Sequence, residues 1–147
     1  MAVTMKTYGQ FLKTALNKEI DWDTDSIKVM LCTALTINQD TPVYLADVTK
    51  TEVASGGGYT TGGKQLTFGS ATAIAYNGTT NTITIDADDV VWISATITAS
   101  YAIIYDDTPV TNKPVIAYVD FGKSQATVSG TFTITWPTAG IATIVVS

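Results

Sequence analysis

Residues 101–121, YAIIYDDTPVTNKPVIAYVDF, decide the fold of this chain. The runs 101–105 and 115–121 are apolar at successive positions except for Asp120, and Asp106-Asp107-Thr108-Pro109 between them has the composition of a turn. A strand that is apolar on both faces is buried on both sides, either inside a protein or against a partner subunit. We therefore expect two central strands in this stretch.

Further strands are predicted on either side of it. Residues 26–35, SIKVMLCTAL, have the pattern of a strand largely buried on both faces. Residues 82–85 and 131–136 instead alternate, with Phe132, Ile134 and Trp136 on one face and threonines on the other. That alternation is typical of half-buried antiparallel strands. Turn signals at Asn77-Gly78 and at 137–140 separate the strands.

Only the N-terminal segment has a clear helical period. Residues 5–18 place Tyr8, Phe11, Leu12, Ala15 and Leu16 at helical spacing, and 44–54 have a weaker pattern that suits one helical turn. The chain therefore reads as one mainly β domain, residues 1–147. We expect an antiparallel β-sandwich or barrel of seven to eight strands, with an N-terminal α-helix at 5–18 and a β-rich body at 26–147.

Composition excludes several classes of function. The chain has 147 residues, of which 46% are apolar and 14% charged, and its net charge is −5. It contains no histidine and no arginine, which removes imidazole chemistry and guanidinium clamps on phosphate. Its two glutamates, Glu19 and Glu52, lie in contexts that look exposed, which argues against a paired-carboxylate glycosidase. We expect a protein without catalytic residues, cofactor or metal.

Charge and hydropathy also bear on partners. A net charge of −5 repels polyanions, so nucleic acid is not an expected ligand. No segment approaches the length of a membrane span, and residues 1–11 show no signal-peptide pattern, which predicts a soluble protein made in the cytoplasm. Cys32 is the single cysteine, and its apolar neighbours predict a buried thiol without a disulfide.

A glycine-rich loop at 55–63 interrupts the strands. In GGGYTTGGKQ, residues 56–65, the spacing of Gly58, Gly63 and Lys64 imitates a phosphate-binding P-loop. The next residue is Gln65 instead of Ser or Thr, and a β-rich run follows where a helix would be required. The loop is better explained as a tight turn or flexible connector.

Acidic clusters and tryptophans leave alternatives open. Asp21, Asp23 and Asp25 imitate the start of a calcium-binding EF-hand loop, but Ser26 and Cys32 occupy positions that require Gly and Glu. Two more acidic clusters are Asp86, Asp88 and Asp89, and Asp106 with Asp107. Turn capping explains all three clusters, and Ca²⁺ binding is the alternative. The tryptophans, Trp22, Trp92 and Trp136, read as core residues, with a sugar-stacking platform as the alternative.

Four blocks of the chain carry a resemblance to a known family. They are MKTYGQFLKTALNKEIDWDTDSIKVMLCT, YLADVTKTEVASGGGYTTGGKQLT, ADDVVWISATITASYAIIYDDT and KPVIAYVDFG, which span residues 5–122. These blocks resemble small virion proteins of tailed bacteriophages, a family described as head decoration or capsid structural proteins. The most specific parts are YTTGG at 59–63 and YDD at 105–107. No functional residue is carried over.

The resemblance implies a non-enzymatic protein on the exterior of the capsid. Such a protein binds the major capsid protein as a symmetric homo-oligomer, with a trimer favoured, stabilises the head, and is made in the host bacterial cytoplasm. We expect Tyr59, Thr60, Gly62, Gly63 and Lys64 to contact the capsid or a sister subunit. A tail or fibre component and a carbohydrate-binding module are the alternatives.

Overall fold

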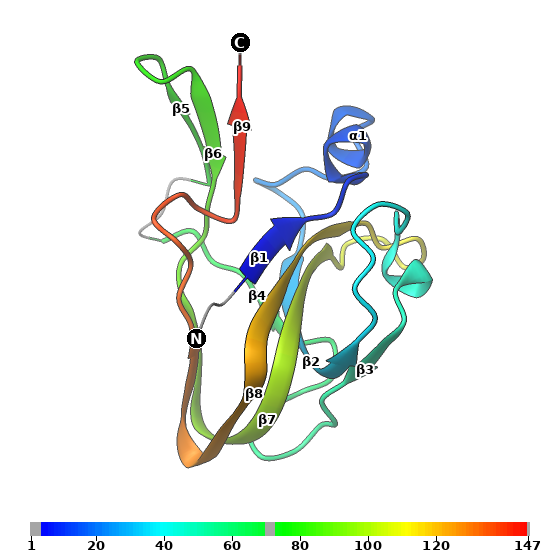
Figure 1. The fold of residues 1–147 in the computed structure, drawn as a ribbon, viewed down its shortest axis with the longest axis vertical. Helices are drawn as coiled ribbons and strands as arrows, with labels where there is room; N and C mark the ends of the chain where they lie inside the picture. The colour runs from blue at the N-terminus through cyan, green and yellow to red at the C-terminus, as the bar shows by residue number, and fades with distance from the viewer. Residues whose placement is uncertain (1–3, 70–72, 147) are drawn as a thin grey trace.

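The computed structural model describes residues 4–69 and 73–146 and folds them into two antiparallel sheets (Figure 1). Its elements, in chain order, are β1 (Thr4–Thr7), α1 (Phe11–Leu16), β2 (Ile27–Leu35), the 3-10 turn η1 (Leu45–Asp47), β3 (Lys50–Glu52), β4 (Lys64–Gln65), β5 (Ile74–Asn77), β6 (Thr82–Ile85), β7 (Val90–Asp106), β8 (Val115–Ile134) and β9 (Ala142–Val145). The predicted mainly β fold with one N-terminal helix is confirmed and is a sandwich rather than a barrel, but the described ranges contain nine strands where seven to eight were predicted. Neither helical segment in those ranges has the length and apolarity to cross a membrane.

The larger sheet is built around residues 101–121, which belong to β7, β8 and the connection between them. Its strand order is β1-β8-β7-β2-β3, and β4 also pairs with β2. The pairing of β7 with β8 runs from Val90 opposite Ile134 to Tyr105 opposite Val115. Residues 102–105 and 115–119 are buried, so this chain itself covers both faces of these central strands.

The β7–β8 hairpin is long and bends back on itself. These strands have 17 and 20 residues, against a usual length of about 5–6. Their register shifts three times between Trp92 and Tyr101, and Ser94 and Ser129 have positive φ. Such bulges bend strands, and Figure 1 shows the hairpin turning back at its lower end. The two halves of the hairpin therefore face each other, and they enclose the main core.

An aromatic cluster joins the facing halves. The ring of Phe132 lies 6.1 Å from that of Phe121 and 6.0 Å from that of Trp92, both in edge-to-face geometry. Phe121 precedes the bend of β8 and Phe132 follows it, so this contact holds the folded-back hairpin closed.

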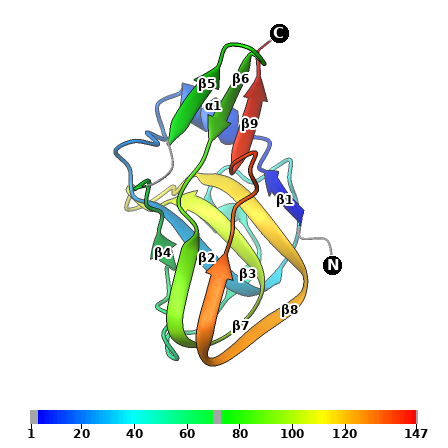
Figure 2. The ribbon, with the colours of Figure 1, turned by 90° about the vertical axis from the view of Figure 1, so that its left-hand side faces the viewer.

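The smaller sheet has the order β5-β6-β9 and projects from the body at the end opposite the bend (Figures 1 and 2). The Asn77-Gly78 turn connects β5 to β6, as predicted, and β6 occupies the predicted residues. All four residues of β5 are exposed. This sheet is thus a thin extension whose inner end alone reaches the core.

The predicted helix at 5–18 is wrong in its first part and too long. Residues 4–7 form β1, which pairs with β8 from Thr4 opposite Asp120 to Thr7 opposite Ala117, and α1 begins only at Phe11. Pairing with an open strand edge outweighs a local helical period, because each residue gains ladder hydrogen bonds and Met5 packs against the core. Leu16, predicted on the apolar face, is exposed.

Candidate functional site

The glycine-rich loop lies against the bend of the β7–β8 hairpin. Gly56 and Tyr59 exchange two backbone hydrogen bonds, and Gly57 and Gly58 between them both have positive φ, as a type I′ turn requires. The Thr96 N–H donates to the Gly57 carbonyl over 2.7 Å. A Cβ on Gly57 would lie 2.5 Å from the Thr96 carbonyl oxygen. This glycine therefore permits a close approach to another backbone, and that backbone belongs to the same chain.

Tyr59 is a core residue. It is 2% exposed, and its hydroxyl accepts a hydrogen bond from the Leu31 N–H at 3.0 Å and donates one to Glu52 Oε1 at 2.8 Å. The same Glu52 oxygen accepts from the Gly62 N–H at 2.5 Å. Burial is the main cause that raises the pKa of Tyr59 above its ordinary value. Glu52 is half-buried, not exposed as its sequence context suggested, and it organises the loop.

Gly62, Gly63 and Lys64 are also held internally. The Tyr105 hydroxyl donates to the Gly62 carbonyl at 2.7 Å, and Lys64 Nζ donates to the Val91 carbonyl at 2.6 Å. Gly63 packs so closely on β2 that a Cβ there would lie 2.0 Å from the Val29 carbonyl oxygen. The loop leads into strand β4 and not into a helix, so the P-loop alternative fails structurally.

These contacts revise the expected contact residues. Tyr59 cannot present its ring to a partner from this conformation, because the ring is buried. The glycines serve contacts within the chain. Thr60 and Lys64 are exposed, and their contact with a partner stays a prediction.

Sequence reasoning missed two exposed apolar residues beside this loop. Ile93 is 74% exposed and Val128 is 82% exposed. Both belong to what we call the bend end, residues 53–63, 93–99 and 124–131, which contains no charged side chain. The sequence contained a signal for Ile93. Successive residues of a strand point to opposite faces, so the residue after the buried Trp92 is expected to point outward, and an apolar residue at that position indicates an exposed apolar side chain.

An uncharged groove of about 970 Å³ is lined by β1, by both halves of β8 and by residues 135–143, which lead from β8 into β9. Its apolar wall includes Met5, Phe121, Phe132 and Trp136, and threonines contribute much of the rest, Thr127 among them. No lining residue is titratable. The groove therefore offers shape and apolar surface, without a general acid, general base or nucleophile.

The first acidic cluster caps a turn. The Asp25 carboxylate accepts from the Asp21 N–H at 2.7 Å, and the Asp21 carboxylate accepts from the Asp23 N–H at 3.2 Å. Local hydrogen bonds of this kind are the usual role of aspartate in turns. Among the residues that the structure describes, no three His, Cys, Asp or Glu side chains converge as metal ligands would.

The other acidic clusters are also engaged in local structure. Asp89 Oδ1 accepts from the Trp136 N–H at 3.0 Å. Asp107 lies 2.5 Å from Lys28 Nζ and also pairs with Lys113. Burial alone would raise the pKa of Asp107, but the two lysines lower it below its ordinary value. Turn capping and ion pairing thus account for these carboxylates.

Asp106 differs because it is completely buried. Its Oδ1 accepts from the Thr108 N–H at 2.8 Å, whereas its Oδ2 has no hydrogen-bond partner among the described residues. Burial and the neighbouring Asp25 carboxyl raise the pKa of Asp106. Burial therefore makes the charged form of this carboxyl group less favourable than it is in an exposed aspartate.

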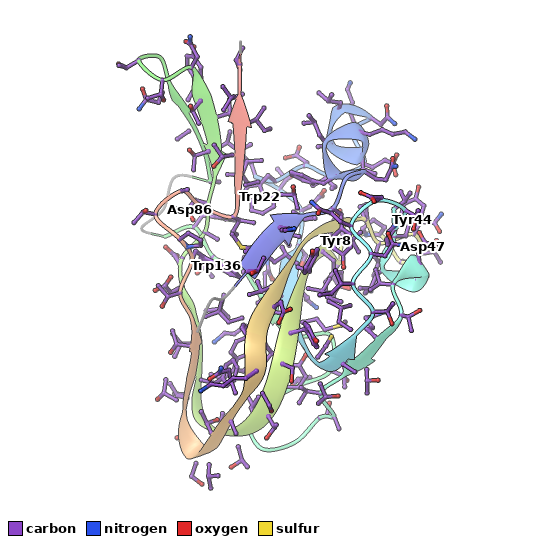
Figure 3. All side chains as sticks on the ribbon, in the orientation of Figure 1. Tyr8, Trp22, Tyr44, Asp47, Asp86 and Trp136 are labelled. Carbon is purple, nitrogen blue, oxygen red and sulfur yellow. The ribbon has the colours of Figure 1, made fainter. Side chains whose placement is uncertain are left out.

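The predicted core role of the tryptophans is confirmed. All three are buried, and two of them, Trp22 and Trp136, are labelled in Figure 3. Trp136 Nε1 donates to the Asp88 carbonyl at 2.9 Å, and Trp22 packs against Phe68. A sugar-stacking platform needs exposed ring faces, so these tryptophans do not provide one.

Comparison of the chain with known protein families, with curated proteins and with solved structures finds no match.

Proposed function

We propose that this protein is a non-enzymatic virion component that binds the outer surface of an icosahedral phage head and stabilises it. The resemblance over residues 5–122 supports this assignment. So does a composition without histidine or arginine, together with a groove lined by no titratable group.

The distribution of charge is the observation that carries the proposal. Residues 53–63, 65–85, 90–105 and 124–147 contain no charged side chain, so all charges lie in the remaining segments. The uncharged segments form the bend end and the projecting sheet, at opposite ends of the long axis (Figure 1). Surfaces without charge are desolvated at low cost, which suits burial against neighbouring proteins.

The bend end is the surface that we assign to the capsid protein. It presents Ile93, Val128 and Thr60 outward, and Lys64 lies beside it. Two apolar side chains on a rigid hairpin bend form a modest contact, but many copies bound to one shell add up to a large stabilisation.

Co-sedimentation with undecorated heads tests this assignment. Expanded and unexpanded heads are incubated with wild type, Ile93→Asp, Val128→Asp and the matched control Val110→Asp. Val110 is equally suited to tolerate the change because it is 95% exposed, on the loop between β7 and β8. We expect saturable binding by wild type and the control and at least tenfold weaker binding by the other two.

Two results would contradict the proposal. Absence of wild-type binding to either form of the head would remove the decoration function, and recovery of the protein with purified tails would favour the tail or fibre alternative. Equal binding by all four proteins would keep the function but move the contact away from the bend end.

A further inference from the structure

The outer edge of β5 is open. No strand of residues 4–69 and 73–146 pairs with that side of β5, and Figure 1 shows β5 as the outermost strand of the projecting sheet. The opposite edge strand, β9, borders a groove of about 360 Å³ that it shares with α1 and the connection before it. Of the two edges of the projecting sheet, β5 therefore offers the clear approach for another strand.

The backbone groups of β5 that face this open side can be identified. In an antiparallel sheet, successive residues direct their N–H and C=O groups alternately to the two sides. The Asp86 N–H donates to the Ala73 carbonyl, so Ala73 and, by alternation, Ala75 face β6. Ile74 and Tyr76 therefore direct their N–H and C=O groups outward.

The other side of β6 agrees with this assignment. The Val146 N–H donates to the Asn81 carbonyl, and β6 pairs with β9 in the same register. Odd-numbered residues of β6 thus bond to β9, which leaves its even-numbered residues for β5. Thr84, which lies opposite Ala75, is one of these.

The composition of this edge favours a second copy of the chain as the occupant. Charged side chains, proline or short length protect natural edge strands; β5, IAYN, has neither a charge nor a proline, and its four residues are the one such feature that it has. The three strands of the projecting sheet carry no charged side chain in a chain of net charge −5, and Asp86 follows β6 only at the inner end of the sheet. Two copies can therefore meet here without like-charge repulsion. Tyr76, which is 63% exposed, and Ile74 share the apolar face of this sheet with Ile83.

We propose that two copies of this chain pair through β5, antiparallel, about a two-fold axis at Ala75. In this register Ile74 of each copy lies opposite Tyr76 of the other, and their outward groups form four N–H···O=C bonds. Each such pair joins a β-branched and an aromatic side chain on the same face, a favourable cross-strand combination. The three-stranded sheets become one six-stranded sheet.

The geometry gives this dimer an elongated shape. Because the paired strands run antiparallel, the two bodies lie at opposite ends of the joined sheet, with one bend end at each extremity. Such a dimer presents two identical contact surfaces far apart and could bridge two sites on a larger assembly. The pairing itself does not depend on the proposed function, and it differs from the trimer that the resemblance implies.

A disulfide test follows from the register. Opposite residues of a non-hydrogen-bonded pair have Cα atoms about 4.5 Å apart, within the range that a disulfide spans. In the proposed dimer, Ala75 of one copy lies opposite Ala75 of the other as such a pair. Ala75→Cys should therefore form a covalent dimer under mild oxidation. Thr80→Cys, exposed at the tip of the same hairpin, is the matched control and should stay uncrosslinked. The one native thiol, Cys32, is buried.

Sedimentation equilibrium of the full chain completes the test. We expect a wild-type dimer and, for the double variant Ile74→Lys/Tyr76→Lys, at least tenfold weaker dimerisation with an unchanged circular dichroism spectrum. Thr80→Lys should dimerise like wild type. A wild-type monomer at all concentrations, a trimer, or a dimer in which Ala75→Cys does not crosslink would each overturn the proposal.

Discussion

Substitution of Gly63 by alanine should destabilise the fold far more than the same change one residue earlier. Gly62 and Gly63 both have positive φ, +93° and +79°, so alanine is strained at either position. Their surroundings differ. A Cβ at Gly62 would meet only the Tyr105 hydroxyl, at 3.8 Å, whereas a Cβ at Gly63 would lie 2.0 Å from the Val29 carbonyl oxygen and 2.8 Å from the Met30 Cα.

The magnitude follows from these distances. Ordinary van der Waals contact begins at 3.4 Å, so the Cβ at Gly63 falls about 1.4 Å short of it against backbone that side-chain rotation cannot move. Relief requires β4 to leave β2, with loss of the Val29–Lys64 and Lys28–Gln65 pairings. Backbone strain lowers the free energy of unfolding by about 1–2 kcal/mol for alanine at either glycine. At Gly63, overpacking lowers it by about 1–3 kcal/mol more, and each lost hydrogen bond by about 1 kcal/mol.

Denaturant unfolding followed by tryptophan fluorescence measures both variants. We expect Gly62→Ala to lose about 1–2 kcal/mol of unfolding free energy and Gly63→Ala at least about 4 kcal/mol, a large share of a typical domain stability. Valine at Gly63 should lower the unfolding free energy more than alanine does. Loss of partner binding by Gly63→Val would therefore report unfolding of the chain and not the loss of a direct contact. If the two alanine variants differed by less than about 1 kcal/mol, the described packing of this loop on β2 would be refuted.

Three further outcomes are expected. Tyr59→Phe leaves the buried Leu31 N–H without an acceptor and should lower the unfolding free energy by about 1–3 kcal/mol. The control Tyr76→Phe, at an exposed site, should change the unfolding free energy little. Equal effects of the two substitutions would contradict the buried hydrogen-bond network. Because the folded-state pKa of Asp106 is raised from 3.8, its contribution to stability is present at low pH and is lost as pH rises through the folded pKa. Asp106→Asn should therefore remove this contribution, so that the wild type loses stability relative to the variant as pH rises above 3.8. Parallel urea titrations of the two proteins across pH would show a constant difference if the carboxyl were ordinary. Burial raises the pKa of Cys32 to about 12, so the thiol should react with Ellman's reagent only after unfolding, and rapid labelling of the folded chain would contradict its burial.

Elements with a strong local pattern could be predicted from the sequence. Residues 82–85 alternate strictly, and β6 occupies those residues. Residues 26–35 carry a nearly continuous apolar run, and β2 covers Ile27–Leu35. The error at 5–7 has the opposite cause, because the pairing partner of β1 lies at 117–120, where no local pattern reveals it.

The candidate site was harder to predict, for a related reason. GGGYTTGG indicates a loop, and a tyrosine in a loop is expected to be exposed, but the partners that bury Tyr59 come from distant strands, Leu31 on β2 and Trp92 on β7. The close approaches of Gly57 to Thr96 and of Gly63 to Val29 are likewise contacts between segments far apart in the sequence. Sequence predicts that a glycine permits such an approach, whereas only the fold identifies the backbone approached.

The charge distribution connects the fold to the proposed role. The acidic groups that carry the net charge of −5 are used locally, as turn caps near Asp21 and as an ion-pair centre at Asp107. Charges placed in this way are already solvated or paired within the chain and have little left to gain from a partner. The bend end and the projecting sheet have no charge to desolvate and expose apolar side chains, Val128 at one end and Tyr76 at the other. We therefore expect the two proposed associations to be driven by apolar burial and backbone pairing, and their strength to depend only weakly on ionic strength.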